Sequence, residues 1–127
     1  MPESSQGASP CSPHLGIISL LRAAKIDLSD EKRAQDDIAD VLTQAGISFG
    51  REVRLSAADI VDFAAGGLVI EVKLHGARKK KVYRQLCRYA RHPSVSALML
   101  ASSLSMGLPA VIEGKDVYFV KLGEGWL

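Results

Sequence analysis

The chain has 127 residues and a formal net charge of +2, and 47% of its residues are hydrophobic while 24% are charged. These values are typical of a single globular domain with a buried core, and they exclude disorder throughout. No apolar run reaches the roughly 20 residues needed to cross a bilayer. The start resembles no signal peptide, and the two cysteines form no zinc or disulfide framework. We therefore expect a cytoplasmic protein without a membrane partner.

The first 14 residues, rich in Ser, Pro, Gly and Gln, predict a disordered tail, and residues 15–127 predict one domain. Within it, residues 15–24 predict a short apolar helix. A second helix is expected over residues 29–45, because apolar residues recur there at helical spacing. Asp27 or Ser29 is its expected cap, and Gly46 its expected stop.

Three strands are expected next, followed by a helix and two further strands. The predicted strands are 52–55, 60–64, 68–74, 95–101 and 117–122, and the helix is 80–91. Gly66-Gly67 separates two apolar runs, which is a strong hairpin signal. The order predicts an α/β fold with a central mixed sheet of about four to five strands flanked by helices. The strand after the 80–91 helix should lie parallel to a neighbour.

The predicted hairpin brings two carboxylates together. With a two-residue turn at Gly66-Gly67, Asp62 lies opposite Glu71 on one face of the sheet. Like charges so close destabilise a sheet unless they are compensated, and two carboxylates are ligands that Mg²⁺ or Mn²⁺ accepts. Lys73, two residues after Glu71, projects from the same face, whereas alternation sends Asp59 to the other. Taken alone, this triplet is also compatible with an ordinary charged strand.

Basic residues are concentrated after this strand. Eight Lys or Arg residues and no acid occur between Lys73 and Pro93, whereas residues 27–40 carry six acids. Such asymmetry indicates a basic face suited to a polyanion, or else a solvated helix with surplus cations. The residues that we expect to contact nucleic acid are Arg78, Lys79, Lys80, Lys81, Arg84, Arg88 and Arg91. Within the same region His75 could meet a substrate or only end a strand, and Tyr89 could stack on a base or edge the core.

These residues resemble the PD-(D/E)XK nuclease superfamily, which includes restriction endonucleases and Holliday-junction resolvases. The matching pieces are Asp62-Phe63 and, nine residues after Asp62, Glu71-Val72-Lys73. The resemblance covers about residues 29–101, with Val61 in place of the proline that names the motif. It implies a restriction-endonuclease-like core in αβββαβ order.

The resemblance also implies a set of roles. Asp62 and Glu71 become metal ligands, Lys73 the catalytic lysine, Glu31 an accessory acid and Gln85 a helix residue near the active site. The implied chemistry is hydrolysis of phosphodiester bonds, in which Mg²⁺ or Mn²⁺ polarises the phosphate and helps to generate hydroxide. We therefore expect a metal-dependent endonuclease acting on duplex or branched DNA, as a homodimer by analogy.

Two alternatives remain open. The first is a nucleic-acid binding or assembly module that keeps the fold without turnover. The second is an α/β domain whose acid–lysine triplet is accidental and whose partner is a protein. The first predicts binding without cleavage, whereas the second predicts no binding to nucleic acid.

Overall fold

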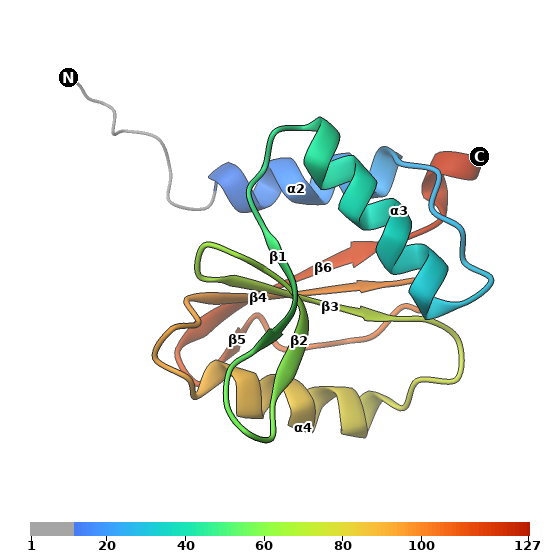
Figure 1. Ribbon diagram of the computed structural model, residues 1–127. Helices are drawn as coiled ribbons and strands as arrows, with labels where there is room; N and C mark the ends of the chain where they lie inside the picture. The colour runs from blue at the N-terminus through green and yellow to red at the C-terminus, as the bar shows by residue number, and fades with distance from the viewer. Residues whose placement is uncertain (1–11) are drawn as a thin grey trace.

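A computed structural model describes residues 12–127, which form a three-layer α/β arrangement (Figure 1). Helices α2 (Ser12–Ala23) and α3 (Glu31–Gln44) cover one face of the sheet, and α4 (Lys79–Ala90) covers the other. The strands are β1 (Gly50–Arg54), β2 (Ile60–Ala65), β3 (Leu68–Lys73), β4 (Ala97–Ser102), β5 (Val111–Ile112) and β6 (Lys115–Lys121), followed by the 3₁₀ helix η1 (Glu124–Trp126).

The six strands form one mixed sheet in the order β1-β2-β3-β4-β6-β5. Strands β3, β4 and β6 run parallel, and the remaining neighbours pair antiparallel. The predicted α/β class and the parallel placement of the strand after α4 are confirmed. The predicted number of strands was too low, because β5 spans only two residues and is too short to produce an alternating pattern.

A hydrophobic core lies on each side of the sheet. Toward α2 and α3, Leu21, Ile38 and Phe63 are fully buried, and toward α4, Leu86 and Leu98 are fully buried. A strand covered by a core on both faces has apolar residues at successive positions, as in residues 97–102. The two cores fix α3 and α4 on opposite sides of β3.

The helix boundaries differ from the predicted ones by a few residues. Asp30, and neither Asp27 nor Ser29, caps α3, because its side chain accepts a hydrogen bond from Arg33 N at 2.8 Å. Asp27 instead accepts from the amide and hydroxyl of Ser29. Helix α2 begins at Ser12, three residues before its predicted start, and residues 1–11 of the predicted tail lie outside the described part of the chain.

The β2–β3 hairpin has the predicted two-residue turn, with Ala65 paired to Leu68. Its two glycines serve different purposes. Gly66 adopts a φ of 61°, which favours glycine, whereas Gly67 has no positive φ. A Cβ at Gly67 would lie 2.2 Å from Ser96 Oγ, so this position requires glycine for close approach to the segment before β4.

Two long-range contacts fix the outer elements. Lys115 Nζ donates to the carbonyls of Ala90, His92 and Val95, which satisfies main-chain acceptors at the C-terminal end of α4. Trp126 Nε1 donates to Ile26 O at 2.8 Å and thereby holds η1 against the segment after α2. Within residues 12–127, no helix has the length and apolar character required to cross a membrane.

Candidate active site

Strands β2 and β3 separate at Asp62 and Glu71. Their backbone ladder ends at the pair Phe63–Ile70, and the next pair interacts through side chains instead. Asp62 N donates to Glu71 Oε1 at 3.2 Å, and Val72 N donates to Asp62 Oδ2 at 2.7 Å. Each carboxylate therefore accepts a main-chain amide of the facing strand. These hydrogen bonds hold the two acids side by side at the point where the hairpin opens.

This placement makes both carboxylates hard to ionise. Glu71 is only 3% exposed, and burial, followed by the neighbouring charge of Asp62, raises its pKa to about 7. Burial likewise raises the pKa of Asp62, against the hydrogen bond from Val72. Lys73 acts in the opposite direction on both groups. A positive charge brought to this pair would therefore favour its ionised form.

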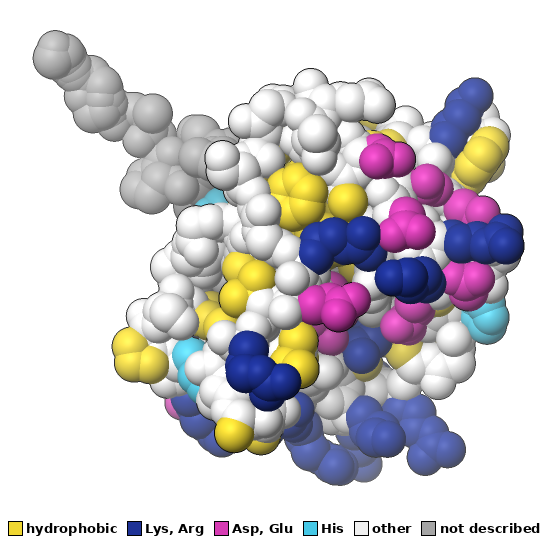
Figure 2. Space-filling view, viewed as in Figure 1, with side chains coloured by type: hydrophobic (Ala, Val, Ile, Leu, Met, Phe, Trp, Pro, Cys, Tyr) yellow, Lys and Arg dark blue, Asp and Glu magenta, His cyan; other side chains and the backbone are white. Residues whose placement is uncertain are grey.

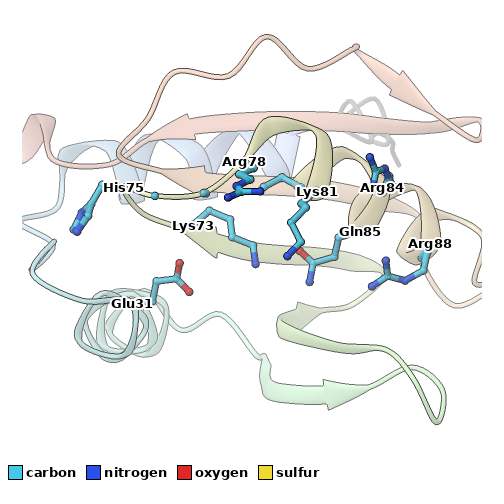
Figure 3. A pocket seen from close by; sticks show the side chains of 11 residues that line it. Glu31, Lys73, His75, Arg78, Lys81, Arg84, Gln85 and Arg88 are labelled. Carbon is cyan, nitrogen blue, oxygen red and sulfur yellow. The ribbon is translucent and has the colours of Figure 1, made fainter.

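Lys73 and Glu31 approach the carboxylate pair from two elements. Lys73 Nζ lies 3.5 Å from Glu71 Oε2, at the end of β3. Glu31, the first residue of α3, accepts a hydrogen bond through Oε2 from Leu74 N at 3.3 Å. Figure 3 shows the side chains of Glu31 and Lys73 facing each other across the same space. The N-terminus of α3 is thus joined to the end of β3 beside the lysine.

A cleft of about 770 Å³ opens between α3, the end of β3 and α4. Lys73, Lys81, Gln85 and Arg88 point into it, and Arg84 also contributes to its lining (Figure 3). Its lining residues are Glu31, Lys73, His75, Gly76, Ala77, Arg78, Lys81, Val82, Arg84, Gln85 and Arg88. Asp62 and Glu71 are not among them, so Lys73 is the residue that joins the carboxylate pair to the cleft.

The seven predicted nucleic-acid contacts fall into three groups. Four of them, Arg78, Lys81, Arg84 and Arg88, line the cleft. Lys79 and Lys80 line a separate groove on the outer side of α4. Arg91, the C-cap of α4, lies outside both and is 3.8 Å from Glu113. Figure 2 shows Lys and Arg side chains gathered along the lower edge of the molecule, over α4, as the charge asymmetry predicted.

Asp59 interacts with Arg88 and His92, which lie about 30 residues later in the sequence. Asp59 is 6% exposed and lies 3.1 Å from Arg88 Nε and 3.1 Å from His92 Nε2, and the hydrogen bond with His92 is the largest influence lowering its pKa. Asp59 precedes β2, so the strand alternation on which its predicted facing relied does not extend to it. It remains separate from the Asp62–Glu71 pair.

Glu52 is a carboxylate that the sequence did not indicate. It lies in β1 between Arg51, which pairs with Phe63, and Val53, which pairs with Val61, so it is placed across from Asp62. Its φ is 50°, a conformation that non-glycine residues rarely adopt in a strand. Its charge contributes to the raised pKa of Asp62. Only the location of Glu52 in a strand was predicted, since neither its φ nor its neighbour follows from local sequence.

The two tyrosines of α4 have opposite environments. Tyr89 is 1% exposed and donates through its hydroxyl to Ile60 O at 3.1 Å, which excludes stacking on a base in this conformation. Burial also raises its pKa. Tyr83 is 41% exposed and lines the groove that contains Lys79 and Lys80. The residue suited to stacking is therefore Tyr83 and not Tyr89.

The donor chemistry of Asp62 and Glu71 fits a divalent cation of the magnesium type. Mg²⁺ in proteins is commonly held by one or two carboxylates together with waters and substrate phosphates, and it needs no cage of protein ligands. Within residues 12–127, no group of three or more His, Cys, Asp or Glu side chains is arranged to hold a metal ion. Asp62 and Glu71 are therefore the two adjacent acids that could hold such an ion.

Comparisons of the chain with protein-family models, with curated proteins and with solved structures gave no match.

Proposed function

We propose that the chain is a metal-dependent nuclease that hydrolyses phosphodiester bonds in DNA, most simply an endonuclease acting on duplex or branched DNA. The observation that carries the proposal is the convergence of Asp62, Glu71 and Lys73 at the opening of the β2–β3 pair, beside a cleft lined by cations. The order α3, β1 to β3, α4, β4 supports a restriction-endonuclease-like core. The second groove, beside Tyr83, is lined by cations but by no acid.

Asp62 and Glu71 are the residues that would hold Mg²⁺ or Mn²⁺. When bound, such a cation supplies charge neutralisation at the phosphate and a water of lowered pKa. Without it, burial and mutual repulsion keep the pair partly protonated. Burial and mutual repulsion destabilise the ionised pair, and both effects are relieved by a bound cation, so they favour cation binding.

The side chains of the cleft account for substrate placement. Lys73, 3.5 Å from Glu71, is positioned to contact a phosphate oxygen or to orient the attacking water. Gln85 points into the cleft next to Lys81 and can donate or accept a hydrogen bond there. Arg78, Lys81 and Arg88 offer positive charge to the phosphate backbone. Glu31, held by Leu74 N, sets one wall of the cleft.

One observation favours a second candidate, a nucleic-acid binding module without turnover. Neither Asp62 nor Glu71 lines the cleft, and Lys73 lies between Glu71 and the open space. In that case the basic cleft would bind nucleic acid while the buried carboxylates served only to close the hairpin. Both candidates share the cleft, and they differ in whether a phosphodiester bond is broken.

Cleavage of supercoiled, linear, single-stranded and four-way-junction DNA with Mg²⁺ or Mn²⁺ tests the nuclease proposal. The variants Asp62→Asn, Glu71→Gln and Lys73→Met should lose cleavage while retaining the fold by circular dichroism. Asp40→Asn, an exposed acid on α3, is the matched control and should cut like the wild-type protein. Binding by every variant with no cleavage by any protein would instead support the binding module.

We also propose a homodimer, because cutting both strands of a duplex requires two reaction centres or two successive events. Light scattering during size-exclusion chromatography, with and without a four-way junction, measures the stoichiometry directly. A monomer that cuts both strands at the same rate at all protein concentrations would contradict it.

A further inference from the structure

A second concave surface lies on α4 next to the basic cleft. It is a groove of about 590 Å³ between the helix and residues 107–109. Its lining residues are Lys79, Lys80, Tyr83, Arg84, Gly107, Leu108 and Pro109. An aromatic ring and two apolar side chains are thus combined with three cations and no acid.

Tyr83 provides the flat surface of this groove. Its side chain is 41% exposed, and it lines the groove together with Lys79 and Lys80. An exposed aromatic ring beside lysines is a suitable surface for a nucleic-acid base.

Arg84 connects the groove to the cleft, because it lines both. The two sites therefore lie next to each other on α4 and share one cation. A strand whose phosphate occupies the cleft can therefore reach the groove within a few nucleotides.

We propose that this groove binds an unpaired base of the substrate strand, stacked on Tyr83, with the neighbouring phosphates on Lys79, Lys80 and Arg84. The proposal rests on the proposed nuclease function and specifies its substrate class. A continuous duplex cannot supply the contact, because its bases are stacked inside the helix. The substrate accordingly contains a single-stranded segment, such as a flap, a branch or a frayed end, within a few nucleotides of the cut.

The groove is better suited to a nucleotide than to a peptide. Its three cations match the regular negative charge of a phosphate backbone, and no acid lines it to attract a basic partner. Base–aromatic stacking supplies affinity for any base, so no sequence-reading element is required.

The test measures binding of a labelled 12-nucleotide thymidine oligomer and of a 12-base-pair duplex, both in EDTA. Tyr83→Ala should weaken binding of the single strand about fivefold or more, since stacking is worth roughly 1–3 kcal/mol per base, and should change duplex binding less than twofold. Tyr83→Phe keeps the ring and should bind like the wild-type protein. Lys80→Ala, a matched change of charge, should weaken both probes to a similar degree. A similar loss of binding to a uridine 12-mer by Tyr83→Ala would support the same assignment, because stacking involves the base and not the sugar.

Unchanged single-strand binding by Tyr83→Ala would overturn the proposal and leave the groove to a protein partner. Equal losses on the single strand and the duplex would overturn it as well, because the groove would then contact only the backbone. Either result, obtained with a wild-type protein that still cleaves DNA in Mg²⁺, removes the groove assignment alone. A wild-type protein that neither binds nor cuts any of these nucleic acids would contradict both the groove and the proposed function.

Discussion

Asp62 and Glu71 are joined by a hydrogen bond in which the amide of Asp62 donates to Glu71 Oε1 at 3.2 Å. The reciprocal contact comes from Val72 N to Asp62 Oδ2. These bonds replace the next step of the β2–β3 ladder, so opening of the hairpin and placement of the carboxylates have one cause. The arrangement uses main-chain donors to hold two groups that would otherwise repel each other.

The first prediction concerns the pH dependence of folding without metal. The pKa of Glu71 is about 7 in the folded chain, above its ordinary value of 4.5. The associated stability is fully present below pH 4.5 and is lost as the pH rises toward 7. Glu71→Gln removes this loss and should be more stable than the wild-type protein at pH 8, by on the order of 3 kcal/mol at about 1.4 kcal/mol per pKa unit.

Urea unfolding in EDTA between pH 4.5 and 8 measures this difference. Asp40→Asn is the control and should follow the wild-type curve. A Glu71→Gln protein that is less stable than the wild type at pH 8 would show that the ionised carboxylate is not destabilising there.

The second prediction concerns the backbone of Glu52. Its φ of 50° costs a non-glycine residue about 1–2 kcal/mol. Glycine adopts this φ without that cost, but it loses more backbone entropy when the chain folds. Glu52→Gly should therefore raise the free energy of unfolding by about 0.5–1 kcal/mol. The gain should increase as the pH rises and Asp62 ionises, since the substitution also removes a charge that repels the Asp62 carboxylate.

Glu113 provides a matched control, because its φ is 51° in the turn between β5 and β6. Glu113→Gly should give a similar gain by thermal unfolding, with little change between pH 6 and pH 8. If Glu52→Gly instead destabilises the chain while Glu113→Gly stabilises it, the Glu52 side chain contributes more than its backbone conformation costs.

The third prediction separates two kinds of glycine. Gly67→Ala should destabilise the fold by about 1–3 kcal/mol, because the new Cβ would press on Ser96, including its backbone nitrogen at 3.2 Å. Gly16→Ala should stabilise it by about 0.5–1 kcal/mol, since Gly16 lies within α2 with no atom near its Cβ position. Chemical unfolding of both variants measures the contrast. Equal effects would mean that close approach at Gly67 is unimportant.

The fourth prediction concerns the salt dependence of DNA binding. Lys81 lines the cleft, so Lys81→Ala should weaken binding to duplex DNA and reduce the slope of log affinity against log salt by about 1. Arg91→Ala, outside the cleft and next to Glu113, should leave the slope nearly unchanged. Fluorescence anisotropy at several salt concentrations gives both slopes, and identical slopes for the two variants would contradict the placement of the DNA.

The features that the sequence predicted correctly depend on local patterns. The glycine pair fixes the β2–β3 register, and that register alone brings Asp62 to Glu71. The inward side of α4 could also have been read further, because Tyr89 lies seven residues after Val82 and three after Leu86. Helical spacing would thus have placed Tyr89 in the core stripe, where the structure buries it, whereas the prediction for Tyr89 remained open between stacking on a base and the edge of the core.

The features that escaped prediction depend on contacts between distant segments. Asp59 meets Arg88 and His92 only after α4 has packed on the sheet. The groove beside Tyr83 forms between α4 and the loop of residues 107–109, which follows Tyr83 by more than 20 residues in the sequence. Local spacing contains no information on such pairs, since the arrangement of the layers determines them.

The most direct test of the central claim is single-turnover cleavage of a four-way junction as a function of Mg²⁺, comparing the wild-type protein with Glu71→Gln. We expect wild-type cleavage that rises with Mg²⁺ to saturation and stops in EDTA, and a rate at least 100-fold lower for Glu71→Gln, on the scale typical of losing one catalytic group. Equal rates for both proteins, or tight junction binding with no cleavage at any Mg²⁺ concentration, would contradict the nuclease account.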